Sequence, residues 1–552
     1  MRAGTRLTRV VATATAIALA ATACGGGDDD TGGVGAATAA DGNEIVRASW
    51  GDPQNPLEPA NTNEVQGGKV LDMIFRGLKR YNPDTGEAED AVAESIETED
   101  QQTFTVTIEE GWTFQDGTPV TSHSFVDAWN YGANIENTQV NSYFFQFIEG
   151  YENVHPGDEG DSPTADSMSG LEIIDDRTFD VTLSEPFSLW PETLGYNAYA
   201  PLPQAFFDDH DAWLEQPIGN GPYMIDSYSR SQSMNLVRYE DYAGDDEAQN
   251  DGVELRVYTD NNTAYTDLQA GNLDIVDDIP ASQLINAEDD LGDRYINEPA
   301  GIIQTISFPL YDEAWQGEDM ARVRQGLSMA INREEITERI FFGTRTPATD
   351  YTSPVLQEAG GYQEGLCGEF CEYDPDRARE LIEEGGGLPG GEVTLSSNVD
   401  TGSHRQWMDA ACNSINNVLG DTGACTVNPV PTFADYRNQI TDREMTGMFR
   451  TGWQMDYPLI QNFLQPLYYT DASSNDSEYT SEEFDRLVNE ANAAEDPDEA
   501  IDTFQEAQEV LIRDMPSIPL WYQNGTAGYS ENVSNVQLNP FSVPVYTEIT
   551  VD

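Results

Sequence analysis

The stretch Thr103-Phe-Thr-Val-Thr-Ile-Glu-Glu-Gly-Trp-Thr-Phe-Gln-Asp-Gly-Thr-Pro119 contains a strand pattern, a turn and the approach to a helix. Polar and apolar residues alternate over 103–108, which predicts a half-buried strand. Asp116-Gly117 predicts a turn, and Phe125 and Trp129 then stand one helical turn apart in a predicted helix. A strand followed directly by a helix is typical of an α/β protein, so we expect an α/β fold.

Five helices are predicted in the second half of the chain from the spacing of apolar residues. Positions 323, 327, 330 and 331 share one face of the first helix. Asn332 and Glu335 have the spacing of a capping pair, which predicts a second helix over 333–342 that ends at Gly343. The other three are predicted from Pro375 to Gly385, over 481–493 and over 497–513. We interpret their apolar stripes as core packing without a ligand role.

The composition is that of a folded and strongly acidic protein. Of 552 residues, 38% are hydrophobic and 10% are aromatic, whereas a disordered chain would lack those aromatic residues. The 26 basic and 99 acidic residues give a net charge of −73, which repels phosphate backbones and excludes nucleic acid as a partner. Because the acidic residues are scattered along the whole chain, we interpret them as a solvated shell and not as a site for cationic ligands.

Residues 1–23 have the features of a secretory signal peptide. Three arginines precede the apolar residues 10–21, a stretch shorter than the roughly 20 residues that a membrane-spanning helix needs. The run Leu19-Ala-Ala-Thr-Ala-Cys24 resembles a bacterial lipobox, with Ala21 where Leu is usual. We therefore expect lipidation of Cys24 and a polar, Gly-rich tether over 24–43. The alternative is ordinary cleavage after Ala21-Thr-Ala23, which would leave a free thiol.

The other four cysteines are Cys367, Cys371, Cys412 and Cys425. An even number in an exported chain favours disulfides, and of the three connectivities we predict the local one, 367–371 and 412–425. A zinc site is the alternative, but the spacings differ from paired CxxC knuckles and the nearest histidine is the isolated His404. We expect no metal and no cofactor.

The sequence contains no arrangement of residues that is typical of catalysis. Its four histidines are dispersed, and it has no HExxH, GxSxG, P-loop or GxGxxG motif. Pairs of acidic residues are too common in this chain to be interpreted as catalytic. We therefore predict that the protein is not an enzyme. A secreted hydrolase of peptides or glycans stays open as an alternative, because a glycosidase needs only two carboxylates.

A series of motifs occurs in order from about Glu44 to the C-terminus. It consists of Phe75-Arg-Gly-Leu-Lys-Arg-Tyr-Asn-Pro-Asp-Thr-Gly86, the strand at 103–108 with Gly111-Trp-Thr-Phe-Gln-Asp-Gly-Thr-Pro119, Pro217-Ile-Gly-Asn-Gly-Pro-Tyr223, Leu268-Gln-Ala-Gly-Asn-Leu-Asp-Ile275, the helix at 321–342, Tyr373-Asp-Pro375 and Gly452-Trp-Gln-Met-Asp-Tyr-Pro458. In this order the series resembles the family 5 extracellular solute-binding proteins, the oligopeptide- and dipeptide-binding components of bacterial ABC importers. Asn220 stands where the family usually has Thr, and we interpret Gly219, Asn220 and Gly221 as a structural turn.

The resemblance implies a two-lobed clamp of the large, type II periplasmic-binding-protein class, with mixed sheets flanked by helices. Lobe I would comprise 44–297 and 520–552, with an extra subdomain over 62–190, and lobe II would comprise 298–519. A lipid on Cys24 would hold the chain at the outer face of the cytoplasmic membrane, where it would deliver its ligand to the permease subunits of an ABC transporter. We expect a monomer.

The resemblance also implies that a short peptide is held as an added strand by main-chain hydrogen bonds. Asp456 would pair with the α-ammonium of the peptide, since a buried ammonium needs a carboxylate partner. Trp453 would form a wall of the pocket, with core packing as the alternative. Arg450 stands where some oligopeptide binders have a pocket arginine, and it would meet a ligand carboxylate or form a surface ion pair.

Other ligands and roles stay open within the same resemblance. Related proteins bind nickel chelates, haem, sugars or antibiotics, and a sensor that feeds a signalling partner would have the same sequence features. The residue that receives the C-terminus of a peptide is not identified by the motifs, so the peptide length also stays open.

Overall fold

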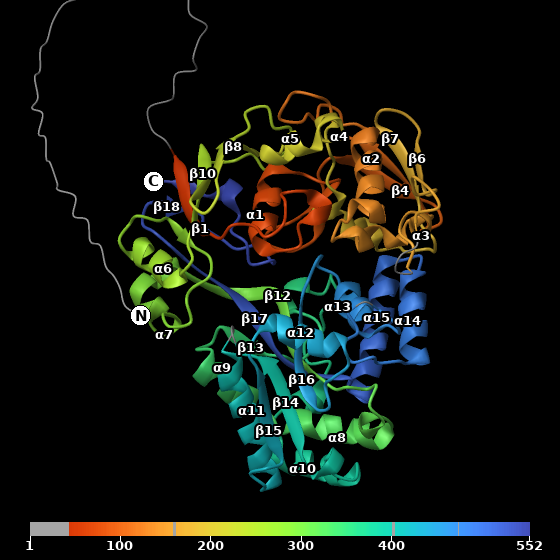
Figure 1. Ribbon diagram of the computed structural model, residues 1–552, viewed down its shortest axis with the longest axis vertical. Coiled ribbons are helices and arrows are strands. Elements are labelled where there is room, and N and C mark those ends of the chain that lie inside the picture. Colours follow the sequence, from red (N-terminus) through yellow and green to blue (C-terminus); the bar gives the residue numbers. More distant parts are fainter. Residues whose placement is uncertain (1–43, 158–161, 400–402, 473) are drawn as a thin grey trace, which may run out of the picture. The chain divides into compact units, whose positions relative to one another are not determined.

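Two long strands, β12 (Tyr295–Ser307) and β17 (Ser517–Tyr529), lie side by side in the middle of the large sheet (Figure 1). They belong to a computed structural model that describes residues 44–157, 162–399, 403–472 and 474–552. Glu44–Asp552 form one compact unit. The predicted signal peptide, Cys24 and the tether lie outside the described residues.

Within the described residues the large sheet has 11 strands. Its order is β15 (Cys425–Val430), β14 (Val393–Asn398), β16 (Met448–Gln454), β12, β17, β11 (Ile275–Val276), β1 (Ile45–Trp50), β10 (Gly252–Val257), β9 (Ser233–Arg238) and β8 (Tyr223–Ser229), and β13 (Arg345–Pro347) pairs with β17. β14 runs parallel to β15 and β16, and β1 runs parallel to β10 and β11, whereas β12 and β17 are antiparallel. The sheet is therefore mixed, as predicted.

The chain passes between the two halves of this sheet through β12 and β17. β12 pairs with β16 from Ile302 to Ser307, and the end of β17 pairs with β11 at Gly528 and Tyr529. The β12–β17 pairing has two register shifts, one from Pro299 to Ile302 and one between Gln304 and Thr305, opposite Pro519 to Trp521. The predicted boundary 297/298 lies beside the first shift, and 519/520 lies at the second. The lobe boundaries stay a prediction.

The described residues also form three smaller sheets, which do not pair with the large one. The four-stranded sheet has the order β4 (Ala93–Thr98), β5 (Thr103–Ile108), β7 (Thr178–Thr182) and β6 (Leu171–Ile173), and two-stranded sheets are formed by β2 (Lys79–Tyr81) with β3 (Ala88–Asp90) and by β18 (Val533–Ser534) with β19 (Thr550–Val551). In β5 every second residue is buried, as the alternation predicted. Phe125 and Trp129 are fully buried in the following helix, α2 (Ser122–Ala133).

The predicted helices are present, with small differences at their ends. They are α8 (Glu318–Met329), α9 (Arg333–Ile340), α10 (Pro375–Glu384), α14 (Glu482–Asn492) and α15 (Pro497–Asp514). Asn332 caps α9 by accepting from the backbone N–H of Glu335. α9 stops at Ile340 and not at Phe342, because Phe342 and Gly343 both have positive φ, which ends the helical path.

The other helices complete the layers around the sheets. They are α1 (Val65–Ile74), α3 (Tyr151–Val154), α4 (Gln204–Asp208), α5 (His210–Glu215), α6 (Asn261–Gln269), α7 (Leu284–Leu291), α11 (His404–Leu419), α12 (Phe433–Thr441) and α13 (Ile460–Tyr468). In the described part of the chain, no helix has both the length and the apolar composition that crossing a membrane requires.

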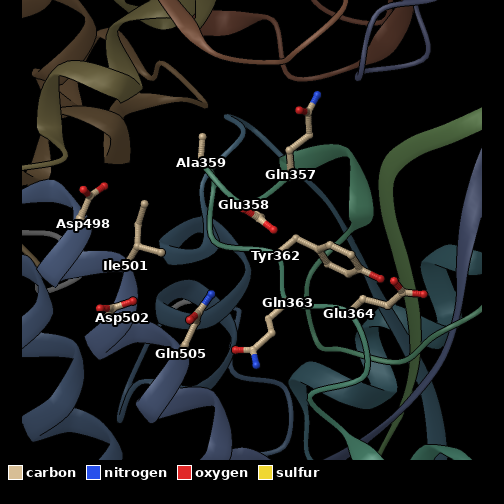
Figure 2. Close-up of a pocket in the computed structure, with 10 residues that line it drawn as sticks. All are labelled: Gln357, Glu358, Ala359, Tyr362, Gln363, Glu364, Asp498, Ile501, Asp502 and Gln505. Atoms are coloured by element: carbon tan, nitrogen blue, oxygen red, sulfur yellow. The ribbon is translucent and has the colours of Figure 1, made fainter.

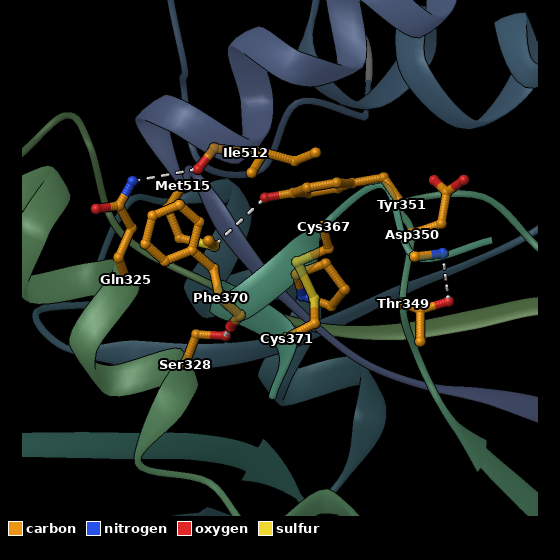
Figure 3. Close-up of a disulfide and its surroundings, with 12 residues drawn as sticks. Gln325, Ser328, Thr349, Asp350, Tyr351, Cys367, Phe370, Cys371, Ile512 and Met515 are labelled. Carbon is orange, nitrogen blue, oxygen red and sulfur yellow. Dashed lines mark hydrogen bonds between the residues drawn. A yellow bond between two sulfur atoms is a disulfide. The ribbon is translucent and has the colours of Figure 1, made fainter. Parts of the chain in front are cut away.

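Both local disulfides are present. Cys367 is bonded to Cys371, and Cys412 to Cys425. Figure 3 shows the first of them between two neighbouring segments: the backbone N–H of Cys367 donates to Thr349 O (3.0 Å), and Ser328 Oγ donates to Phe370 O (2.6 Å). The short loop closed by this disulfide is therefore tied to α8 and to the chain that follows β13.

Candidate functional site

One edge of β16 has no strand beside it over part of its length. β12 pairs with β16 from Phe449 to Gln454, but on the other side β14 pairs with Met448 and Phe449 alone. Just beyond the β14–β16 pairing, the Tyr436 hydroxyl donates a hydrogen bond to Arg450 O. From residue 451 to 454, no described strand pairs with this edge, so its backbone groups are open to an added strand.

Asp456 lies just beyond this edge and is a carboxylate without a cation. Its backbone N–H donates to Asn462 Oδ1 (2.9 Å), and its Oδ2 accepts from Asn462 Nδ2 (3.2 Å) and from the Tyr143 hydroxyl (3.4 Å). No salt bridge joins it to a described basic residue. Burial raises the pKa of Asp456 to about 6, although the hydrogen bonds from Asn462 and Tyr143 lower it.

The surroundings of Asp456 are largely aromatic. Burial raises the pKa values of Tyr143, Tyr196 and Tyr457, and the negative charge of Asp456 raises each of them further. Phe144 stacks on Tyr196 with ring centroids 4.2 Å apart. Asp456 is half-buried, and a cation that reached its ionised carboxylate would be stabilised more than one at a fully exposed carboxylate, because the local dielectric is lower.

Trp453 is held by the same amide as Asp456. Its indole Nε1 donates to Asn462 Oδ1 (2.9 Å), and its ring packs against the buried cluster that contains Ile303, Met455 and Phe463. Trp453 also lines a cavity of about 230 Å³, which we call the β16 cavity. The two interpretations of this residue, pocket wall and core packing, are therefore compatible.

Arg450 lines the β16 cavity as well. Its Nε is buried and has no hydrogen-bond partner, and no described carboxylate lies within salt-bridge distance of its guanidinium. Burial lowers the pKa of Arg450, and the neighbouring charge of Arg437 lowers it further. The alternative of a surface ion pair is not observed among the described residues.

Asn462 and Tyr143 were not identified from the sequence. Asn462 is in α13, six residues after Asp456, and is buried. Tyr143 is 313 residues before Asp456 and reaches it only through the fold. Neither residue belongs to a motif in the sequence, so nothing in the spacing points to them.

The turn at 219–221 is structural. Asn220 is fully buried, and its side-chain amide accepts from Arg76 N (3.0 Å) and donates to Arg76 O (2.9 Å). A Cβ at Gly219 would lie 1.8 Å from Ile74 O, so no other residue fits at that position. The amide of Asn220 thus ties the turn to the end of α1, and none of the three residues lines the β16 cavity.

A second and larger hollow, of about 830 Å³, lies between α15 and residues 357–364 (Figure 2). We call it the acidic groove, because its lining includes Glu358, Glu364, Asp498 and Asp502 and no basic residue. It contains none of the predicted site residues. Among the described residues, no group of three His, Cys, Asp or Glu side chains is arranged to hold a metal ion.

Residues 87–475 match a family described as bacterial extracellular solute-binding proteins, family 5 Middle. The oligopeptide-binding protein OppA of Bacillus subtilis is 25% identical over 502 residues, which cover 87% of this chain and 88% of OppA. The glutathione-binding protein GsiB of Salmonella typhimurium is 24% identical over 490 residues, which cover 88% of this chain and 90% of GsiB.

Solved structures agree with the sequence matches. The murein tripeptide-binding protein MppA, in its unliganded open form, superposes with a TM-score of 0.78 at 21% identity, over 93% of this chain and 98% of MppA. Haemophilus influenzae OppA in complex with RPPGFSPFR superposes with a TM-score of 0.73 at 20% identity, over 93% of this chain and 99% of OppA. The predicted two-lobed, periplasmic-binding-protein-like fold is confirmed. The chain belongs to family 5 of the bacterial extracellular solute-binding proteins.

Proposed function

We propose that this protein captures short peptides outside the cytoplasmic membrane and delivers them to the permease of an ABC transporter. The observation that carries the proposal is the open edge of β16 with Asp456 beyond one end and Arg450 at the other. A peptide that adds to this edge would be held through its main chain, whatever its side chains are.

The two charged residues are suited to the two charges of a peptide. Asp456 carries a negative charge with no cation beside it, which fits the α-ammonium at the N-terminus. Arg450 carries a positive charge with no carboxylate beside it, which fits a ligand carboxylate. The separation of six residues along the chain corresponds to roughly 20 Å of extended strand, so a peptide would span it only if it were longer than a dipeptide.

The names of relatives point to the same class of ligand. OppA and DppE of Bacillus subtilis are named for oligopeptides and dipeptides, GsiB for glutathione, and one solved relative of the fold is DppA from Helicobacter pylori in complex with the peptide STSA. These ligands share a free amino group and amide-containing main chain, which are the groups that the edge of β16 and Asp456 would bind.

The proposed clamp closes by movement about β12 and β17. Lobe I would comprise 44–297 and 520–552, including the subdomain 62–190, and lobe II would comprise 298–519. Ligand bound between the lobes is desolvated from both sides. Closure also gives the ligand-bound receptor a shape that the permease can distinguish from the open, ligand-free form. A lipid on Cys24 would keep this receptor at the membrane surface. Substitution Cys24→Ser should release the protein into the medium with its fold intact.

The test of the proposed function is mass spectrometry of small molecules released from purified, denatured protein. We expect a population of short peptides, and we expect titration with the same peptides to return them unchanged. A metal chelate, sugar, haem or antibiotic as the released ligand would replace the peptide within the same family. Cleaved peptides in the titration would favour a hydrolase.

A further inference from the structure

The side-chain amide of Asn462 lies between Trp453 and Asp456 and bonds to both. Its Oδ1 accepts from the Trp453 indole Nε1 (2.9 Å) and from the backbone N–H of Asp456 (2.9 Å), and its Nδ2 donates to Asp456 Oδ2 (3.2 Å). Asn462 is in the first turn of α13, where side chains point back toward the segment that precedes the helix. It is 1% exposed, so these bonds form away from bulk water.

The two accepted bonds fix the orientation of this amide. Both donors, an indole N–H and a backbone N–H, have no capacity to accept, so the carbonyl oxygen of Asn462 must face them. The amino group is then turned toward the carboxylate of Asp456. The presence of a hydrogen-bond donor at this carboxylate therefore follows from the fold and not from a free choice between two orientations of the amide.

The two oxygens of the Asp456 carboxylate differ as a result. Oδ2 accepts from Asn462 and from the Tyr143 hydroxyl (3.4 Å). Oδ1 accepts from no described residue, yet it is not one of the fully buried polar atoms that lack a partner. Because Asp456 is half-buried, Oδ1 keeps an accessible surface through which a ligand can reach it.

The amide also favours the charged form of Asp456. Burial raises the pKa of this carboxyl to about 6, and the hydrogen bond from Asn462 is the largest of the effects that lower it. The other titratable groups close to Asp456 are tyrosines whose pKa values are raised by burial, so none of them changes charge near pH 6. They are Tyr81, Tyr143, Tyr196 and Tyr457.

We propose that Asn462 is the positioning residue of the ammonium subsite: it holds Oδ2 of Asp456 and leaves Oδ1 as the acceptor for the α-ammonium of the peptide. The same amide holds Trp453, which lines the β16 cavity, so the carboxylate and the indole ring keep one relative orientation. Asn462 acts through these two residues. This inference rests on the proposed function, because it requires an ammonium at Asp456.

The test is calorimetric titration of Asn462→Leu with a free and an N-acetylated alanine tetrapeptide. Leu has the branched shape of Asn but neither donates nor accepts hydrogen bonds. We expect affinity for the free peptide to fall roughly tenfold to a hundredfold, which is the range for a hydrogen bond to a charged group. Affinity for the acetylated peptide should change less than about threefold. The pH below which the free peptide binds poorly should also move upward from about 6, because the pKa of Asp456 rises when this hydrogen bond is lost.

A double-mutant cycle with Asp456→Asn separates positioning from a general loss of structure. If Asn462 acts through Asp456, Asn462→Leu should cost little further affinity once Asp456 is replaced. The matched control is Asn250→Leu, because Asn250 is also a buried amide and donates to Tyr546 O and Ile549 O. It should lower the melting temperature and leave the ratio of free to acetylated affinity unchanged.

Each further outcome decides the inference. Asn462→Ala, which cannot overfill the site, replaces Asn462→Leu if the latter does not fold. An unchanged ratio of free to acetylated affinity in the folded variant, or losses that multiply with that of Asp456→Asn, overturns the inference and leaves the proposed function standing. A crystal structure of the peptide complex should place the ammonium on Oδ1, and an ammonium on Oδ2 in place of Asn462 also overturns it. If the wild type bound free and acetylated peptides equally, the role of Asp456 in the proposed function would fail first.

Discussion

The β16 cavity and the acidic groove are both lined by residues between 298 and 519, but their polar groups differ in exposure and in hydrogen bonding. The acidic groove is the larger, and its carboxylates at Glu358, Glu364, Asp498 and Asp502 are exposed. Water can satisfy all of them. The β16 cavity is smaller, and one of the residues that line it, Arg450, has a buried guanidinium nitrogen without a partner.

The two hollows show which properties indicate a ligand site in a very acidic protein. Acidic side chains are common over the whole chain, so a group of them in a hollow is expected by chance and indicates solubility. A buried polar group without a partner is uncommon, because leaving it unpaired costs about 1–3 kcal/mol. The described residues contain other buried groups without partners, Trp112 Nε1 and Trp190 Nε1 among them. Such a group therefore indicates a site here only where it also lies beside a cavity or an open strand edge, as Arg450 does.

The largest effect is expected from removal of the charge of Asp456, which lies outside both hollows, just beyond the open edge of β16. Asp456→Asn keeps the side-chain size but leaves the peptide ammonium with a neutral acceptor. We expect peptide affinity to fall at least about a hundredfold, since loss of one partner of a desolvated charge pair typically costs about 2–5 kcal/mol. Calorimetry with free and N-acetylated peptides measures the effect.

The matched control is Asp502→Asn in the acidic groove, which also replaces an aspartate by its amide. It should leave peptide affinity within about twofold of the wild type. Equal binding of free and acetylated peptides by the wild-type protein would remove Asp456 from the ammonium subsite, and the assignment would then move to another solute.

The pH dependence of binding is the second test. Burial raises the pKa of Asp456 in the ligand-free protein to about 6, and a bound ammonium would lower it. Peptide binding should therefore release a proton below pH 6, and affinity should fall by about tenfold between pH 7 and pH 5. Titrations in buffers of different ionisation enthalpy measure the proton release.

The same group gives the ligand-free fold an opposite dependence on pH. Because the folded pKa lies above the unfolded value of 3.8, the folded state holds the proton more tightly. The contribution of Asp456 to stability is full below pH 4 and is lost as the pH rises through 6. Asp456→Asn should remove this component from the pH profile of the melting temperature. A profile that is unchanged by the substitution would contradict the burial of this carboxylate.

Much of the fold could be predicted from the sequence, because the signals are local. The alternation at 103–108 and the capping pair at Asn332 and Glu335 each depend on neighbouring residues, and both were confirmed. The end of α9 was predicted two residues late, since the positive φ of Phe342 gives no signal in its side chain.

The site could be predicted only where a motif marks it. Asp456, Trp453 and Arg450 were identified through the motif at 452–458 or by their position relative to it. Asn462, which holds both Asp456 and Trp453, and Tyr143, which donates to Asp456, reach these residues only through the fold. No sequence pattern shows which buried donors lack a partner, because this depends on the positions of all neighbouring acceptors in the folded chain.

Salt should act on the acidic surface as a whole and only weakly on the site. Raising the ionic strength screens repulsion among exposed carboxylates, so the melting temperature should rise. Affinity for peptides without charged side chains should change only about twofold, since the half-buried Asp456 is screened less than fully exposed charges. Thermal scans and titrations over the same salt series compare the two responses. A steep loss of affinity for every peptide would instead make the acidic surface part of the binding site.

The smallest expected effect is that of neutralising the acidic groove completely. Glu358→Gln, Glu364→Gln, Asp498→Asn and Asp502→Asn together remove four negative charges from one exposed region. If these carboxylates serve only as a solvated shell, the combined variant should bind peptides as the wild type does and should melt at an equal or slightly higher temperature at low salt, because surface repulsion falls. If the groove instead recruits cationic peptides, the association rate for lysine-rich peptides should fall while the rate for neutral peptides stays constant. Stopped-flow measurements with the two peptide types separate these outcomes, and a selective loss for the cationic type would mean that exposed charge, and not only unsatisfied burial, contributes to recognition in this protein.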